Sequence, residues 1–176
     1  MAKGKLGFVG LGIMGKPMAK NLLKAGYEVV AYDIVGEALE EVVSEGAEAG
    51  ESPKDVSQKT TTIITMLPDG PDVEKVVLGP NGVLEGAQSG SVIIDMSSIS
   101  PLVSKNVYEE CQKKGVDLLD APVSGGEPGA ISGTLAIMVG GNKETFDKHI
   151  PMLEVLGKSV VLTGEIGAGN ITKLAN

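Results

Sequence analysis

Three glycines near the start of the chain are spaced to suit a bound phosphate. They form a Gly-x-Gly-x-x-Gly pattern directly after a short apolar run. The first glycine permits a tight turn, the second lets the backbone approach a pyrophosphate, and the third lets a helix pack closely on a strand. A helix that begins there offers unpaired N–H groups and a partial positive charge to an anion. The candidate pyrophosphate-binding residues are Gly10, Leu11, Gly12, Ile13, Met14 and Gly15.

An acidic residue follows the second apolar run. The carboxylate of Asp33 can accept hydrogen bonds from both hydroxyls of an adenosine ribose, and it would repel a 2′-phosphate. Ile34 comes next, and the first cation after Asp33 is Lys54. The residues therefore predict an NAD site, with NAD (NADH) preferred over NADP. A structural turn with a surface aspartate is the alternative interpretation.

Lys173 could carry proton chemistry. Reduction of a carbonyl by hydride places negative charge on oxygen, and an ammonium group within hydrogen-bond reach both stabilises that charge and delivers the proton. A single lysine near the start of a helix is more often a solvated surface charge. Taken alone, this residue therefore favours the solvated surface charge.

A glycine-rich segment offers a second polar group. Ser124 supplies a hydroxyl, and Gly125 and Gly126 supply backbone amides without side chains, which together could hold a substrate carboxylate. A plain turn explains the same residues equally well.

Hydrophobic periodicity predicts the elements that position these groups. Short apolar runs alternate with segments of helical spacing, which indicates an α/β fold of the Rossmann type, with a doubly wound, mostly parallel sheet. A Gly/Pro-punctuated loop precedes the strand at 91–95, and a loop at 121–133, too rich in glycine for a helix, allows the next strand to run antiparallel. The expected strands are 6–9, 28–32, 61–66, 91–95, 117–120, 134–139 and 159–162, and the expected helices are 14–25, 37–45, 100–114 and 143–156.

Several motifs follow the carboxyl ends of the predicted strands. Ligands of open α/β sheets bind beyond those ends, so we expect the segments to converge on one crevice. They are 66–68, 97–98 and 124–126.

Composition excludes several other classes of protein. The 176 residues carry a net charge of −8 without a basic cluster, which argues against nucleic-acid binding. Cys111 is the only cysteine, so neither a disulfide framework nor a metal site is predicted. No apolar run has membrane-spanning length and no leader pattern is evident, so we expect a cytoplasmic protein that does not bind membranes.

Five motifs in one order resemble the 3-hydroxyisobutyrate dehydrogenase family of β-hydroxyacid dehydrogenases. The likeness covers the whole chain. The motifs are residues 8–15 (FVGLGIMG), 66–68 (MLP), 95–101 (DMSSISP), 120–126 (DAPVSGG) and 167–173 (GAGNITK).

The resemblance implies a role for each candidate residue. In the Gly-x-Gly-x-x-x-Lys frame Lys173 becomes the catalytic proton donor, and Ser124, Gly125 and Gly126 become substrate-binding. Four residues are implied on the cofactor side: Leu67, Pro68, Asp72 and Ser98. The family places an amide one turn after the lysine; Asn176 lies three residues on and is the candidate for this substrate-binding role.

The resemblance also implies an activity: NADH-dependent, reversible reduction of tartronate semialdehyde to D-glycerate. Oxidation of 3-hydroxyisobutyrate or another short β-hydroxyacid is the alternative within the family, and a non-catalytic dinucleotide-binding module is the alternative of another class. We expect residues 1–164 to be the NAD-binding domain and 165–176 to begin an interdomain helix, with the family's helical second domain absent from this chain. By the same resemblance, the full-length protein is expected to form a homo-oligomer.

Overall fold

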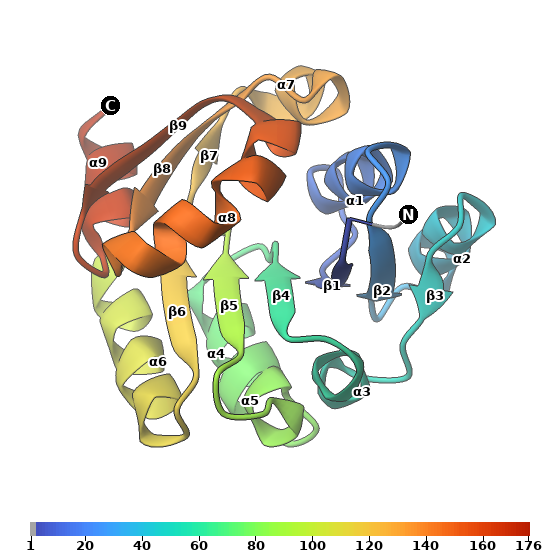
Figure 1. Ribbon diagram of the computed structural model, residues 1–176, viewed down its shortest axis with the longest axis horizontal. Helices are drawn as coiled ribbons and strands as arrows, with labels where there is room; N and C mark the ends of the chain where they lie inside the picture. Colours follow the sequence, from blue (N-terminus) through green and yellow to red (C-terminus); the bar gives the residue numbers. More distant parts are fainter. Residues whose placement is uncertain (1–2) are drawn as a thin grey trace.

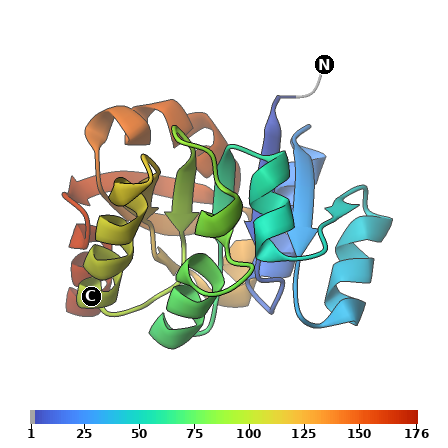
Figure 2. The same ribbon diagram turned by 90° about the horizontal axis from the view of Figure 1, so that it is seen from below.

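Within residues 3–176, which the computed structural model describes, nine strands form one sheet with helices on both faces (Figures 1 and 2). The strands are β1 (Lys5–Val9), β2 (Glu28–Tyr32), β3 (Glu48–Ala49), β4 (Thr62–Thr65), β5 (Val92–Asp95), β6 (Asp117–Asp120), β7 (Val123–Ser124), β8 (Leu135–Gly140) and β9 (Gly157–Gly164). The helices are α1 (Gly15–Lys24), α2 (Gly36–Ser44), α3 (Pro53–Lys59), α4 (Gly70–Leu78), α5 (Val83–Gly86), α6 (Pro101–Lys113), α7 (Gly126–Ser132), α8 (Lys143–Leu156) and α9 (Ala168–Ala175).

The strand order confirms the predicted fold class. Six parallel strands lie in the order β3-β2-β1-β4-β5-β6, which is the arrangement of a doubly wound dinucleotide-binding fold. β8 then runs antiparallel to both β6 and β7, as the sequence allowed, and β9 pairs in parallel with β8.

The register of the parallel strands brings their carboxyl ends level. Val9 pairs with Thr65, Thr65 with Asp95, and Asp95 with Asp120. One row across the sheet therefore marks the point where each chain segment leaves its strand. The glycine loop and the segments after β4, β5 and β6 all begin at this one edge.

Alternating side chains bury a separate core on each face of the sheet. Ile63 and Leu118 pack in one cluster with residues of α3, α4, α5 and α6, whereas Ile64 and Leu119 pack in the other with residues of α1, α2, α7 and α8. All four side chains are fully or almost fully buried. This period of two explains why central strands with apolar residues on both sides lie between two helical layers.

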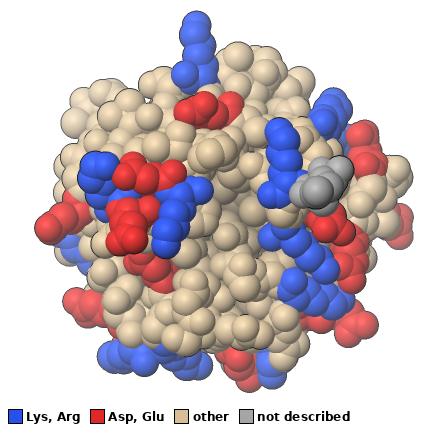
Figure 3. All heavy atoms as spheres, in the orientation of Figure 1, with Lys and Arg blue, Asp and Glu red and all other residues tan. Residues whose placement is uncertain are grey.

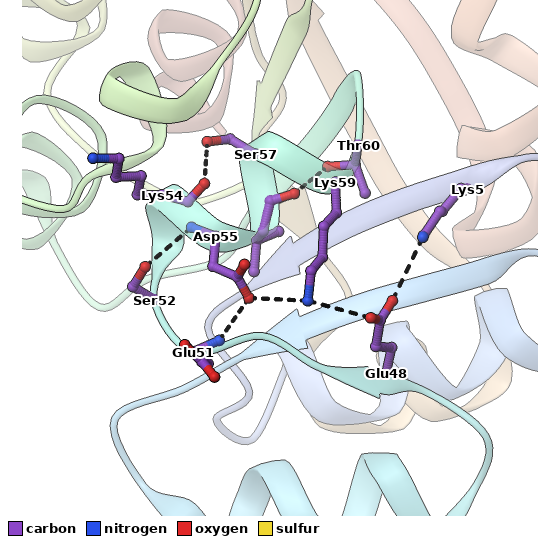
Figure 4. Close-up of polar contacts among 10 residues, drawn as sticks. Lys5, Glu48, Glu51, Ser52, Lys54, Asp55, Ser57, Lys59 and Thr60 are labelled. Atoms are coloured by element: carbon purple, nitrogen blue, oxygen red, sulfur yellow. Dashed lines mark hydrogen bonds and ion pairs between the residues drawn. The ribbon is translucent and has the colours of Figure 1, made fainter.

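Charged residues of both signs are interspersed over the face shown in Figure 3. Figure 4 shows a group of charged residues that joins the short edge strand β3 to its neighbours: Glu48 accepts from Lys59 at 3.2 Å and lies 3.5 Å from Lys5, while Lys59 also meets Asp55 at 3.2 Å. Exposed pairs of this kind are screened by solvent and contribute little to stability. Their effect here is to tie β1, β3 and α3 together at the sheet edge.

Two expectations about loops were wrong. The segment 121–133 contains strand β7 and helix α7, and the Gly/Pro-punctuated stretch before β5 contains α4 and α5. In α7 most of the glycines lie at the ends: Gly125 is the N-cap with φ 138°, and Gly133 is the left-handed C-cap residue with φ 71°. Glycine content alone was therefore a misleading signal, because these glycines begin and end a helix.

No helix among the described residues is both long and apolar enough to cross a membrane.

Candidate active site

Each glycine of the first loop has a distinct structural reason. Gly10 has a φ of 104°, and a Cβ there would collide with the carbonyl oxygen of Met66. A Cβ on Gly15, the first residue of α1, would collide with the carbonyl oxygen of Gly10. Around Gly12, by contrast, no atom lies within 4 Å of the Cβ position. The loop thus closes tightly on the protein side and leaves open space above its second glycine, as a pyrophosphate requires.

The carboxylate of Asp33 lies against this loop. It accepts hydrogen bonds from the backbone N–H of Leu11 at 2.6 Å and of Val35 at 2.8 Å, one to each oxygen. An ionised carboxylate has about four lone-pair positions, so each oxygen keeps capacity for a ribose hydroxyl. Ile34, directly after it, is 88% exposed. The adenosine end of the predicted cofactor site is therefore assembled, with an acid and an apolar side chain side by side.

A groove of about 690 Å³ runs from Asp33 along α1 and α2. The groove is also lined by three lysines of α1 that precede Asp33 in the sequence: Lys16, Lys20 and Lys24. Glu41 of α2 binds the ammonium groups of Lys16 and Lys20, at 3.4 Å and 2.6 Å. Hydrogen bonding to Lys20 lowers the pKa of Glu41. The two lysines are thus paired with an acid of the protein.

The loops after β4 and β5 are joined through a buried carboxylate. Asp95, at the end of β5, accepts from Thr65 Oγ1 at 2.9 Å and from Ser97 Oγ at 2.6 Å. Ser97 Oγ in turn accepts from the backbone N–H of Leu67 at 2.8 Å. This chain of contacts fixes the segment that carries Leu67 relative to the segment that carries Ser98, whose side chain is exposed at the same edge.

The same carboxylate has an unusual environment. All three of the hydrogen bonds that Asp95 accepts, the third from the Ser97 N–H, reach Oδ1, and the buried Oδ2 has no partner. Burial, with a smaller contribution from the neighbouring Asp120, raises the pKa of Asp95 to about 6 against the lowering effect of its hydrogen bonds.

Lys173 and Ser124 meet at the opposite end of the site. The ammonium of Lys173, in the second turn of α9, donates to Ser124 Oγ at 2.7 Å, and both side chains are half-buried. Gly125 and Gly126 follow with φ values of 138° and 60°, a backbone that glycine adopts readily. Two residues chosen separately from the sequence thus lie in direct contact, although 49 positions apart.

Asp72 and Asn176, two of the predicted site residues, contact residues that were not predicted for the site. Asp72 lies in the first turn of α4, where its N–H donates to Asp69 at 3.1 Å and a hydrogen bond with Asp69 raises the pKa of its carboxyl. The amide of Asn176 lies 3.7 Å from the sulfur of Met138 on β8. Pro68 is exposed after β4, beside the loop of Leu67.

Three buried polar residues beneath the site were given no role from the sequence. They are Asp95, Asp120 and Asn170, each 2% exposed or less. The sequence signal for Asp95 and Asp120 was that each of two successive apolar strands, β5 and β6, ends in an acidic residue, and the two residues pair in register. No group of side chains suited to a metal ion occurs among the described residues.

Comparison with known proteins agrees with this geometry. A family model described as the NAD binding domain of 6-phosphogluconate dehydrogenase matches residues 5–164. Two relatives are each 46% identical over 98% of this chain: 2-(hydroxymethyl)glutarate dehydrogenase of Eubacterium barkeri, of which 57% is covered, and 2-hydroxy-3-oxopropionate reductase of Escherichia coli, of which 59% is covered.

A solved structure gives the same result in three dimensions. The 3-hydroxyisobutyrate dehydrogenase of Mycobacterium tuberculosis, solved with L-serine, has a TM-score of 0.94 at 35% identity, covering 100% of this chain and 59% of its own. The chain therefore spans less than two thirds of the length of these relatives. It belongs to the family of NAD-binding domains described for 6-phosphogluconate dehydrogenase, and the resemblance to 3-hydroxyisobutyrate dehydrogenases that its motifs predicted is confirmed.

Proposed function

We propose that this chain is the cofactor-binding part of an NADH-dependent β-hydroxyacid dehydrogenase that reversibly reduces tartronate semialdehyde to D-glycerate. The observation that carries the proposal is the 2.7 Å contact between the Lys173 ammonium and the Ser124 hydroxyl at the carboxyl edge of a dinucleotide-binding sheet. In this proposal residues 1–164 bind the cofactor, and residues 165–176 lead toward a second domain that completes the substrate pocket.

The glycine loop and Asp33 suit NAD. The open space above Gly12 and the N-terminus of α1 would receive the pyrophosphate, and Asp33 would accept from the ribose hydroxyls. A 2′-phosphate would meet the Asp33 carboxylate, while two of the three lysines that line the same groove, Lys16 and Lys20, are already paired with Glu41. These contacts support a preference for NADH over NADPH.

At the other end of the site Lys173 would act on the carbonyl oxygen of the substrate. NADH, when bound, supplies the hydride to the carbonyl carbon. The Lys173 ammonium stabilises the charge that develops on oxygen and transfers its proton there, so aldehyde, hydride and proton together give the alcohol. Ser124 holds the ammonium in place, and the amides of Gly125 and Gly126 would bind the substrate carboxylate.

The names of the relatives support a substrate class. 3-Hydroxyisobutyrate, 2-(hydroxymethyl)glutarate and L-serine all contain a hydroxymethyl group on the carbon that bears a carboxylate. D-Glycerate contains the same unit, and its aldehyde is the substrate in the name of the Escherichia coli relative. A site with one proton donor and one carboxylate loop fits this unit, and 3-hydroxyisobutyrate remains the second candidate substrate.

The test is turnover by the product of the complete gene with tartronate semialdehyde and with the semialdehyde of 3-hydroxyisobutyrate. Lys173→Ala should reduce kcat by about 10² to 10⁴ while NADH affinity stays nearly unchanged. Ser124→Ala should raise KM more than it weakens NADH binding.

Calorimetric titration of the unaltered protein should show tighter binding of NAD than of NADP, and Asp33→Ser should reduce that difference. Tight NAD binding with no turnover of any short semialdehyde would favour the non-catalytic binding module instead.

A further inference from the structure

The helix that carries Lys173 is held at its first turn by a buried acid from another part of the chain. Asp120, at the end of β6, has no exposed surface. Its Oδ1 accepts from the N–H of Gly167 at 2.8 Å, and its Oδ2 accepts from the N–H of Asn170 at 2.9 Å. These N–H groups belong to the beginning of α9, which has no side-chain cap of its own. Asp120 thus caps α9 from 50 residues away, and the positive end of the helix stabilises its buried charge.

Asn170 extends this contact to the cofactor side of the site. The side chain is 1% exposed, and its Oδ1 accepts from the backbone N–H of Ile99, at the end of the loop that carries Ser97 and Ser98, at 3.1 Å. Its Nδ2 donates to Ser104 Oγ at 3.1 Å and to Asp120 Oδ2 at 3.4 Å. One amide therefore connects α9 to the loop after β5, to α6 and to the end of β6.

The backbone around this junction is shaped to admit it. A Cβ on Gly169 would lie 2.5 Å from the carbonyl oxygen of Met138 and 2.7 Å from that of Asp120. A Cβ on Gly140 would collide with Asp120 Oδ1. Both positions have ordinary backbone conformations, because neither has a positive φ. Glycine is needed at both places because α9 approaches the ends of β6 and β8 so closely.

We propose that Asp120 and Asn170 are positioning residues that hold α9 so that the Lys173 ammonium reaches the substrate beside Ser124. Lys173 lies three positions after Asn170, on the same side of the helix and less than one turn away, so a displaced first turn displaces the ammonium. Ser124 follows Asp120 along the same segment, and Asn170 fixes both to the loop of Ser98. The inference rests on the proposed function, in which Lys173 is the proton donor.

The test uses the product of the complete gene and two variants of different kinds. Asp120→Asn keeps the shape of the side chain but turns an amide donor toward backbone N–H groups, and Asn170→Ala removes the link to Ile99. Both should lower kcat by on the order of tenfold or more at saturating NADH, and NADH affinity should stay within about twofold. Asp117→Asn is the matched control, because Asp117 lies on the same strand but bonds Thr145 of α8; it should leave kcat unchanged.

A purely structural role would give a different result. Folded variants with lower melting temperature and unchanged kcat would overturn the inference. Amide hydrogen exchange in the unaltered protein adds a measurement that needs no variant: the amides of Gly167 and Asn170 should exchange as slowly as those of the central strands, and exchange typical of a frayed helix end would also overturn it. Failure of the proposed function itself is recognised separately, because either the unaltered protein would then show no turnover or Lys173→Ala would keep it.

Discussion

Replacement of Asp95 by Asn should make the protein's stability less dependent on pH. In the unaltered protein a fully buried carboxyl has one oxygen with three hydrogen bonds and one with none. Asparagine keeps the accepting oxygen for Thr65 and Ser97 and cannot ionise. The variant therefore removes the titration of this group and preserves the contacts that join the two strand-end loops.

The magnitude follows from the pKa. Burial raises the pKa of Asp95 from an ordinary 3.8 to about 6, which corresponds to about 3 kcal/mol, because one pKa unit is worth about 1.4 kcal/mol. The folded state holds this proton more tightly than the unfolded state. The contribution of Asp95 to stability is therefore greatest when it is protonated and is lost as the pH rises from below 3.8 through about 6. Between pH 5 and pH 8 the loss is about 1.4 kcal/mol, and the remainder falls at lower pH.

Urea unfolding of both proteins at several pH values from 5 to 8 measures this difference. All other titrating groups are shared, so the free energy of unfolding of Asp95→Asn minus that of the unaltered protein should rise by about 1.4 kcal/mol across the range. Parallel profiles would show that the carboxyl titrates alike in the folded and unfolded states. The reasoning from its burial would then be refuted.

Three further predictions concern the glycine loop, the cysteine and the chain as a unit. Gly12→Ala should weaken NAD binding in calorimetry without changing the melting temperature, because its Cβ would meet no protein atom, whereas Gly15→Ala should lower stability by about 1–3 kcal/mol in urea unfolding, because its Cβ would meet the backbone of Gly10. Cys111 should resist alkylation by iodoacetamide at pH 8 until the protein unfolds, because burial raises its pKa to about 12. Residues 1–176 alone should bind NAD in a titration but oxidise NADH at less than a tenth of the rate of the complete gene product, because small displacements of a proton donor cost about 10² in rate.

The elements that were predicted correctly are those with strong periodicity. The strand at residues 28–32 and the helix at 143–156 have the bounds that the apolar pattern predicted. Two of the missed helices, α3 and α4, have a proline in the first turn, and proline is also typical of loops. Pro53 follows the N-cap Ser52, and Pro71 lies in the first turn behind the N-cap Asp69, where the missing N–H of proline costs nothing. Ser52 accepts from the N–H of Asp55, so the sequence signal for the start of α3 was an N-cap serine three residues before Asp55.

The candidate site divides in the same way between local and distant determinants. Gly10–Gly15 and Asp33 were identifiable because a phosphate loop and its ribose acid depend on spacing within one βαβ unit. The supports of Lys173 depend on contacts across 47 to 71 positions, which no local pattern encodes. The row of residues that ends the parallel strands supplies buried contacts to several segments. Thr65 and Asp95 hold the cofactor loops, and Asp120 holds α9. Because the sheet is in register, side chains from distant segments meet there without any long loop. Burial raises the pKa of both Asp95 and Asp120, so the ionisation of these buried carboxyl groups lowers the stability of the fold as the pH rises. Their oxygens nevertheless accept the N–H and O–H groups that fix three separate loops. The reacting groups are therefore held in position at some cost in stability.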